Sequence, residues 1–236
     1  MAALLADVPA RALAVYAHPD DAEVSCGGTL ARWVAAGSQV HVVVCTRGEK
    51  GTLDPGEDPD HLGSRRAAEV EAAASVLGVA GCTSLGYPDG EIEDEPGLRR
   101  ALVRAVRTHR PHTVLCPDPT AVIFGDQYVN HRDHRVVGTA CLDAVAPAAA
   151  RPLYFPDAGA AHQVAEVLLS GTLDPAVWVD ITAAIDVKVA AVGCHRSQFA
   201  DDGAWAATAV RARAEEEGRR AGVAFAEAFR RLRLGG

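Results

Sequence analysis

The hydrophobic and polar positions in the first two thirds of the chain follow two alternating patterns. Continuous runs of apolar and β-branched residues, such as "QVHVVVCT" at 39–46, are typical of strands buried on both faces. Longer segments repeat apolar residues at helical spacing, as where Leu98, Leu102 and Val106 share one face opposite several arginines. The predicted strands are 12–17, 39–46, 83–87 and 112–117. The predicted helices are 23–37, 64–79 and 97–110.

This alternation predicts an α/β fold: a Rossmann-like three-layer sandwich in which a mainly parallel central sheet carries helices on both faces. The last third is less regular. It predicts strands at 162–170 and 176–182 and helices at 183–198 and 210–233. No linker and no internal repeat divides the 236 residues. We therefore expect a single domain, 1–236, with a Rossmann-like core at about 11–155 and a less regular C-terminal part, 156–236.

Composition and charge exclude several classes of protein. The net charge is −8, and acidic residues interrupt the basic segment 211–233, so no nucleic-acid partner is expected. No apolar run approaches the roughly 20 residues that span a bilayer, and the N-terminal segment lacks the basic start of a secretory signal. The six cysteines are scattered without a CxxC pair. This usage favours a reducing cytoplasm over a disulfide framework or a cysteine-rich zinc site.

Three polar clusters follow predicted strands, at the sheet edge where folds of this class bind ligands. "HPDD" (18–21) follows the first strand, "TRGEKG" (46–51) the second, and the loop 117–134 the fourth. A Rossmann nucleotide site is the alternative, but it requires a G-x-G-x-x-G turn directly after the first strand. Because aspartates stand there instead of glycines, the sequence argues against a bound phosphate.

Two of these clusters contain the residue types of a metal site. His18, Asp21 and one histidine of "NHRDHR" (130–135) would supply the three protein ligands that a catalytic zinc takes beside a water. Two histidines and a carboxylate also suit non-haem iron, so the residue types leave the metal open. Taken singly, any one of these residues is more often a helix cap or a surface group: Asp20 or Asp21 would cap the helix that begins near 23, and Asn130 or Asp133 the helix after the second cluster. Two such clusters at one sheet edge favour the metal site.

The remaining polar residues of the two clusters suit hydrolysis at a carbonyl. One of the paired aspartates is free to take a proton from water, since both cannot play the same role. A second-cluster histidine held by a carboxylate would stabilise an oxyanion. Metal-activated water, a carboxylate base and an electrophilic histidine together predict hydrolysis.

The motifs resemble those of the PIG-L/LmbE-like family of zinc-dependent N-acetylglucosaminyl deacetylases, over about residues 11–198. The similarity lies in "AHPDDAE" (17–23), "TRGEKG" (46–51), "SRRAAEVEAAASVLGV" (64–79) with "GYPDG" (86–90), and "NHRDHRVVG" (130–138). "HRSQ" (195–198) is a weaker fifth feature. The second cluster departs from the family's commoner H-P-D-H, because Arg132 replaces the proline.

The resemblance implies a role for each matching residue. The implied metal ligands are His18, Asp21 and His134. The implied catalytic residues are Asp20 as general base, His131 as oxyanion stabiliser and Asp133 as the group that orients His131. The implied substrate-binding residues are Arg66 and Asp89.

The implied activity is metal-dependent removal of the N-acetyl group from an N-acetylglucosamine-containing small molecule or glycoconjugate by zinc-activated water. The implied cofactor is Zn²⁺, with Fe²⁺ or another divalent metal as alternatives, and a homo-oligomer is possible. Two other functions stay open: an amidase of a thiol–sugar conjugate, and a non-catalytic binding protein on the same fold. The intact H-x-D-D and H-x-D-H sets argue against the non-catalytic reading.

Overall fold

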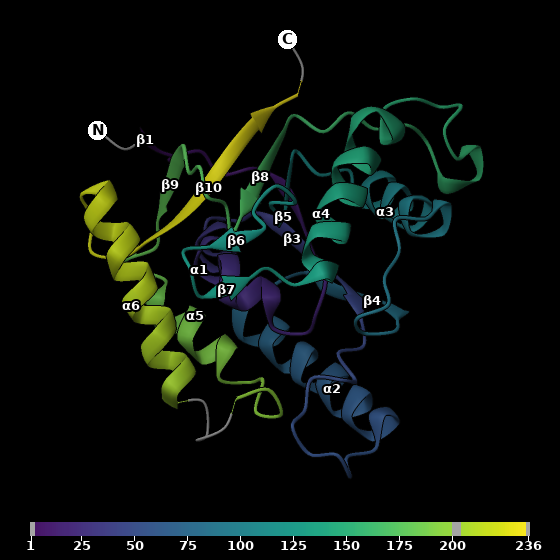
Figure 1. The fold of residues 1–236 in the computed structure, drawn as a ribbon. Coiled ribbons are helices and arrows are strands. Elements are labelled where there is room, and N and C mark those ends of the chain that lie inside the picture. The colour runs from purple at the N-terminus through teal and green to yellow at the C-terminus, as the bar shows by residue number, and fades with distance from the viewer. Residues whose placement is uncertain (1–2, 200–203, 235–236) are drawn as a thin grey trace.

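The computed structural model describes residues 3–199 and 204–234, and an eight-stranded sheet forms its middle layer (Figure 1). The strand order is β1-β9-β10-β8-β5-β2-β3-β4. The strands are β1 (Ala3–Leu4), β2 (Arg11–Tyr16), β3 (Gln39–Thr46), β4 (Gly81–Tyr87), β5 (Thr113–Pro117), β8 (Glu166–Ser170), β9 (Val177–Asp180) and β10 (Ala226–Arg233). A separate hairpin pairs β6 (Ile123–Phe124) with β7 (Tyr128–Val129).

Helices cover both faces of the sheet (Figure 1). They are α1 (Asp21–Ala35), α2 (Pro59–Leu77), α3 (Pro96–His109), α4 (Arg132–Asp143), α5 (Ile185–Val192) and α6 (Ala204–Ala221). Short helical turns span Ala144–Ala149 and Pro156–Ala158. Among the described residues, none of these helices is both long and apolar enough to cross a membrane.

The order of the strands reverses between β2 and β5. Strands β4, β3, β2, β5 and β8 are parallel neighbours, and β10 runs antiparallel between β8 and β9. The chain moves outward from β2 through β3 to β4, then crosses to the other side at β5. This reversal is the topological switch point at which doubly wound sheets bind ligands, outside the carboxyl ends of the strands.

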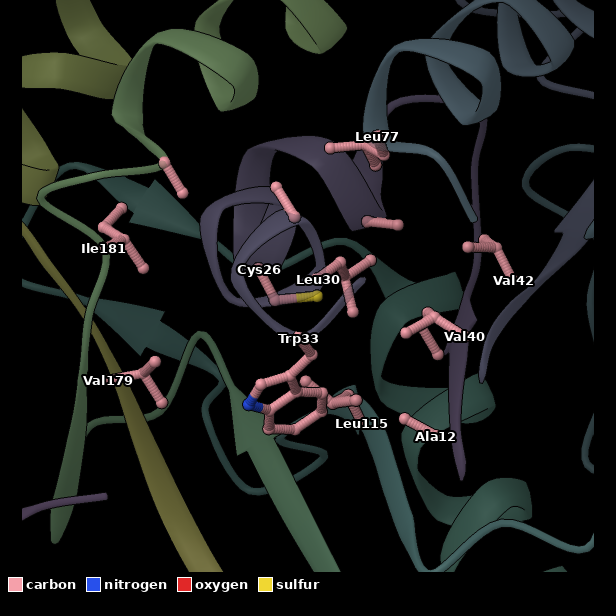
Figure 2. Packing of buried hydrophobic residues seen from close by; sticks show 14 of the residues in the cluster. Ala12, Cys26, Leu30, Trp33, Val40, Val42, Leu77, Leu115, Val179 and Ile181 are labelled. Atoms are coloured by element: carbon pink, nitrogen blue, oxygen red, sulfur yellow. The ribbon is translucent and has the colours of Figure 1, made fainter. Parts of the chain in front are cut away.

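Alternate strand residues build two separate cores. Val42 packs with α1, α2 and α5, whereas its neighbour Val43 packs with α3 and α4. In the first core, the α1 side chains Leu30 and Trp33 lie between the strand residues and Ile181 (Figure 2). Because both faces are covered, the middle residues of the central strands are mainly apolar. The predicted three-layer α/β fold with a mainly parallel sheet is confirmed.

The C-terminal part differs most from the prediction. The helix predicted over 210–233 is correct only up to Ala221, where α6 ends, and wrong beyond it, because the chain returns as β10. Gly222 has φ 76°, a left-handed conformation that glycine adopts without strain and that ends the helix. Pairing of β10 with β8 and β9 then overrides the helix propensity of its residues.

Other boundaries shift by less. The helix predicted over 183–198 stops at Val192, and residues 193–198 form turns. α2 begins at Pro59 instead of 64, because Asp58 caps it by accepting the backbone N–H of Asp60 at 3.0 Å. The strands predicted over 162–170 and 176–182 shorten to β8 and β9.

Candidate metal centre and active site

The first site segment turns directly out of β2 into α1. The backbone N–H of His18 donates to Asp21 Oδ2 at 2.8 Å, which closes the turn. Asp20 lies at φ 100° and ψ −27°, a left-handed conformation that is uncommon outside glycine and that stores strain. It occupies the N-cap position of α1, yet its side chain makes no capping hydrogen bond. The cap explanation therefore does not account for this carboxylate.

The second site segment is separated from its strand, β5, by a longer stretch of chain. β5 ends at Pro117, and the chain passes through the β6–β7 hairpin before it enters α4. His131 is the N-cap residue of α4, and its Nδ1 accepts the backbone N–H of Asp133 at 3.4 Å. At Gly138 a Cβ atom would lie 2.5 Å from the Pro117 carbonyl oxygen, so glycine permits α4 to pack on the end of β5. This close approach brings the first turn of α4, with His134, to the carboxyl end of β5.

Three potential metal ligands from these two segments converge. His18 Nδ1 lies 3.1 Å from His134 Nε2 and 3.4 Å from Asp21 Oδ2. His134 Nε2 lies 3.1 Å from Asp21 Oδ1. A tetrahedral zinc with bonds of about 2.0–2.1 Å separates its ligand atoms by about 3.3 Å. The donor set therefore fits a tetrahedral metal in both chemistry and spacing. A second set, His18, His131 and Asp133, also brings ligand atoms within 4.8 Å of one another.

The electrostatics of this cluster favour a bound cation. His18 Nε2 lies 3.1 Å from Asp89 Oδ1 and 3.4 Å from Asp133 Oδ2. Burial alone would lower the pKa of His18, but contacts with Asp133, Asp21 and Asp89 raise this pKa to about 12. Burial alone would raise the pKa of Asp21, but His134 and His18 hold it well below its usual range. The carboxylates therefore stabilise positive charge at the point where the ligands meet.

Asp20 has the opposite electrostatic character. Burial and the neighbouring Asp21 raise the pKa of Asp20 well above its usual value, and the cationic Arg66 opposes that rise only in part. A carboxylate with a raised pKa exchanges a proton more readily near neutral pH. Paired carboxylates with pKa values pushed apart are typical of an active site in which one is a ligand and the other a base.

His131 is oriented as a hydrogen-bond donor. Burial and the charge of His18 lower its pKa, which favours the neutral ring. Because Nδ1 accepts the N–H of Asp133, the proton of the neutral ring must be on Nε2. The ring stands edge-on to His18, with centroids 4.7 Å apart, so this donor lies beside the proposed ligands.

Asp133 and Asp89 both face His18. The Asp133 carboxylate, predicted to orient His131, accepts the backbone N–H of Gly90 at 2.7 Å and faces His18. Asp89, predicted to bind a sugar hydroxyl, faces the same ring nitrogen and is largely buried. Both carboxylates are thus placed to orient a histidine of the candidate metal set, as outer-shell partners commonly do. Their roles in turnover stay predictions.

Arg66 lies in a cradle made by two glycines of "TRGEKG". A Cβ atom would lie 2.5 Å from its Nη1 at Gly48 and 2.6 Å from its Nη2 at Gly51. The guanidinium donates to the Gly51 carbonyl at 2.8 Å and contacts Gln198 Oε1. It is 3% exposed. The glycines therefore accommodate a buried arginine, and the predicted contact of Arg66 with substrate is not tested by this packing.

Hydrogen bonds and an ion pair attach the "HRSQ" segment to α1 and α2. Ser197 donates to the Glu69 carboxylate through its backbone N–H at 2.8 Å and its hydroxyl at 2.6 Å. His195, which is fully buried, lies 3.3 Å from the carboxylate of Glu23 in α1. Together with the contact between Gln198 and Arg66, these pairs fix the turn after α5 against α1 and α2. The position of Glu23 within the motif "AHPDDAE" was the one sequence feature that pointed to this contact.

A doubly wound α/β sheet with a candidate His/Asp metal site at its switch point defines the class of this protein. Within that class, residues 13–145 match the sequence model of the PIG-L family, described as GlcNAc-PI de-N-acetylase. This match covers more than half of the chain, and the chain therefore belongs to the PIG-L family. The resemblance inferred from the motifs is confirmed.

Individual relatives agree with this assignment. The chain is 32% identical over 195 residues to diacetylchitobiose deacetylase of Thermococcus kodakarensis, covering 81% of this chain and 71% of the relative. It is 35% identical to 1D-myo-inositol 2-acetamido-2-deoxy-alpha-D-glucopyranoside deacetylase of Rhodococcus jostii, covering 66% and 60%. The solved structure of N,N'-diacetylchitobiose deacetylase from Pyrococcus horikoshii superimposes with a TM-score of 0.87 at 30% identity, over 95% of this chain and 84% of that one. These relatives are enzymes that hydrolyse N-acetyl amide bonds.

Proposed function

We propose that this protein is a metal-dependent N-deacetylase that removes the acetyl group from an N-acetylglucosamine-containing small molecule or glycoconjugate. The observation that carries the proposal is the convergence of His18, Asp21 and His134 next to Asp20, whose carboxylate makes no capping hydrogen bond and has a pKa raised by burial and by Asp21. The names of the relatives support the substrate class, since diacetylchitobiose and the inositol glycoside both contain N-acetylated glucosamine.

We propose zinc as the metal, held by His18, Asp21 and His134. When bound there, zinc would lower the pKa of water toward about 7 and polarise the amide carbonyl. Fe²⁺ and other divalent ions accept the same residue types and are the alternatives to zinc. Loading the protein with each metal and measuring its affinity and activity distinguishes them.

The protein's own residues supply the proton transfers. Asp20 takes a proton from the water while the water oxygen attacks the acetamide carbonyl. Asp20 then delivers this proton to the leaving amine as the C–N bond breaks. The Nε2–H of His131 donates to the oxygen that becomes negatively charged in the tetrahedral intermediate. The products are acetate and a free amino sugar.

The sugar is bound, in this proposal, by Arg66 and Asp89. Both border the reacting groups: Arg66 acts electrostatically on Asp20, and Asp89 contacts His18. A cytoplasmic location is supported by the six free cysteines of the structure. Self-association stays a prediction.

Acetate release from the metal-loaded protein tests the proposed function. The substrates are diacetylchitobiose, the N-acetylglucosaminyl inositol glycoside and free N-acetylglucosamine, each with zinc-loaded and chelator-treated protein. We expect zinc-dependent release of acetate from at least one N-acetylated sugar. Release of a larger acid from a thiol–sugar conjugate alone would favour the amidase alternative. Metal and sugar binding without any product would favour the non-catalytic alternative.

A further inference from the structure

We infer that Asn130 is a positioning residue that fixes the ring of the metal ligand His134 and ties it to the base of the β6–β7 hairpin. This inference rests on the proposed metal site. Asn130 directly precedes the "HRDH" cluster and is 7% exposed, so its amide is held inside the protein. Its two side-chain atoms contact different partners, and each contact has a separate consequence.

The hydrogen bonds of Asn130 determine which nitrogen of His134 is free. The amide nitrogen Nδ2 donates to the Ala121 carbonyl at 2.7 Å. A carbonyl oxygen can only accept, so the NH₂ group must face Ala121 and the amide oxygen must face His134. That oxygen lies 3.0 Å from His134 Nδ1, which must therefore carry the proton. The lone pair of His134 is left on Nε2, the atom that meets Asp21 Oδ1 and His18 Nδ1.

The same residue closes the base of the hairpin. The backbone N–H of Asn130 donates to the Val122 carbonyl at 2.8 Å, beside the side-chain bond to Ala121. Beyond this point the hairpin is exposed and apolar, with Ile123 57% and Val129 67% exposed. An isolated two-stranded hairpin is marginally stable. Its attachment through Asn130 therefore holds the hairpin and orients a metal ligand at the same time.

Two substitutions separate these two functions. Asn130→Ala removes both side-chain contacts. Asn130→Asp keeps an oxygen that accepts from His134 Nδ1 but removes the donor to the Ala121 carbonyl. Val129→Ala is the matched control, because it shortens an exposed neighbouring side chain and leaves both contacts intact.

The readouts are zinc affinity, by competition with a chromogenic chelator, and amide hydrogen exchange over residues 119–130 of the metal-free protein. We expect Asn130→Ala to weaken zinc binding by about 10–100-fold, the usual cost of losing an outer-shell partner. Asn130→Asp should retain zinc affinity within a few-fold. Both should exchange faster in the hairpin, whereas Val129→Ala should bind zinc like the wild type.

Wild-type zinc affinity in Asn130→Ala, or equal loss in Asn130→Ala and Asn130→Asp, would overturn the inference. If Asn130→Ala fails to fold, the nitrogen shifts of the His134 ring in the zinc-loaded wild type decide: we expect the metal on Nε2 and the proton on Nδ1, and the reverse contradicts us. No substrate is used in these measurements. A protein that binds zinc as expected but releases no acetate would defeat the proposed function and leave the role of Asn130 standing.

Discussion

The two segments that form the candidate metal centre differ in the contacts that hold them and in the residues they bring to the site. The turn 18–21 comes straight from β2, and its His18 lies against the carboxylates of Asp89 and Asp133. The segment 130–134 arrives after an exposed hairpin, and its His134 is held by the neutral amide of Asn130. The first segment therefore concentrates charge and carries the proposed base, Asp20. The second carries the proposed third ligand, His134, and the proposed donor, His131. Substitutions in each segment should separate chemistry from metal binding.

Asp20→Asn should have the largest effect on turnover within the first segment. It removes the proton acceptor but preserves size and the neighbouring ligands, so we expect kcat to fall by about 10²–10⁴-fold with full zinc content. Acetate release and metal analysis of the same preparation measure both. Wild-type turnover would remove Asp20 from the role of base, and loss of zinc would make it a ligand.

His131→Ala is the corresponding change in the second segment. Loss of one oxyanion donor costs about 10²–10³-fold in kcat, and the KM for the sugar should change little. Steady-state kinetics at saturating zinc measure kcat and KM separately. An effect confined to KM would place His131 in substrate binding instead.

Asp133→Asn tests whether this buried carboxylate orients His18 of the first segment or His131 of the second. Since it faces His18, we expect zinc affinity to fall by about 10–100-fold, with a kcat near the wild-type value once zinc saturates. Chelator competition and kinetics at high zinc give the two values. Unchanged zinc affinity with a lowered kcat would instead support the sequence-based role, in which Asp133 orients His131.

Glu69→Ala should have the smallest effect on chemistry, because it acts through the "HRSQ" turn. It removes two hydrogen bonds to Ser197, which we expect to cost about 1–3 kcal/mol of stability. The midpoint of thermal unfolding should fall by roughly 2–4 °C for each kcal/mol of stability lost. Loss of zinc at ambient temperature in the folded variant would contradict a purely tethering role.

The layered fold was predictable because strands such as β3 are buried on both faces and their sequences are continuously apolar. The approach of His18 to the second cluster was predictable because each follows a strand of the same parallel sheet, whereas His134 as the third ligand rests on the family resemblance and stays a prediction. β10 was not predictable from local pattern, since its residues favour a helix and only pairing with β8 and β9 makes them a strand.

Side-chain direction within the site was equally hidden. Asp133 is next to His134 in sequence but faces His18, and Glu23 meets His195 from the far end of the chain. Spacing along the sequence identifies which residues gather at a sheet edge. The partner that each side chain selects depends on tertiary packing, which no local pattern encodes.

The central claim is that His18, Asp21 and His134 hold the metal, and not the second set of His18, His131 and Asp133 that lies beside them. Zinc content of His134→Ala and His131→Ala, loaded and desalted in parallel, tests this claim most directly. We predict that His134→Ala loses its zinc and His131→Ala retains about one zinc per chain. Retention in His134→Ala together with loss in His131→Ala would contradict the account.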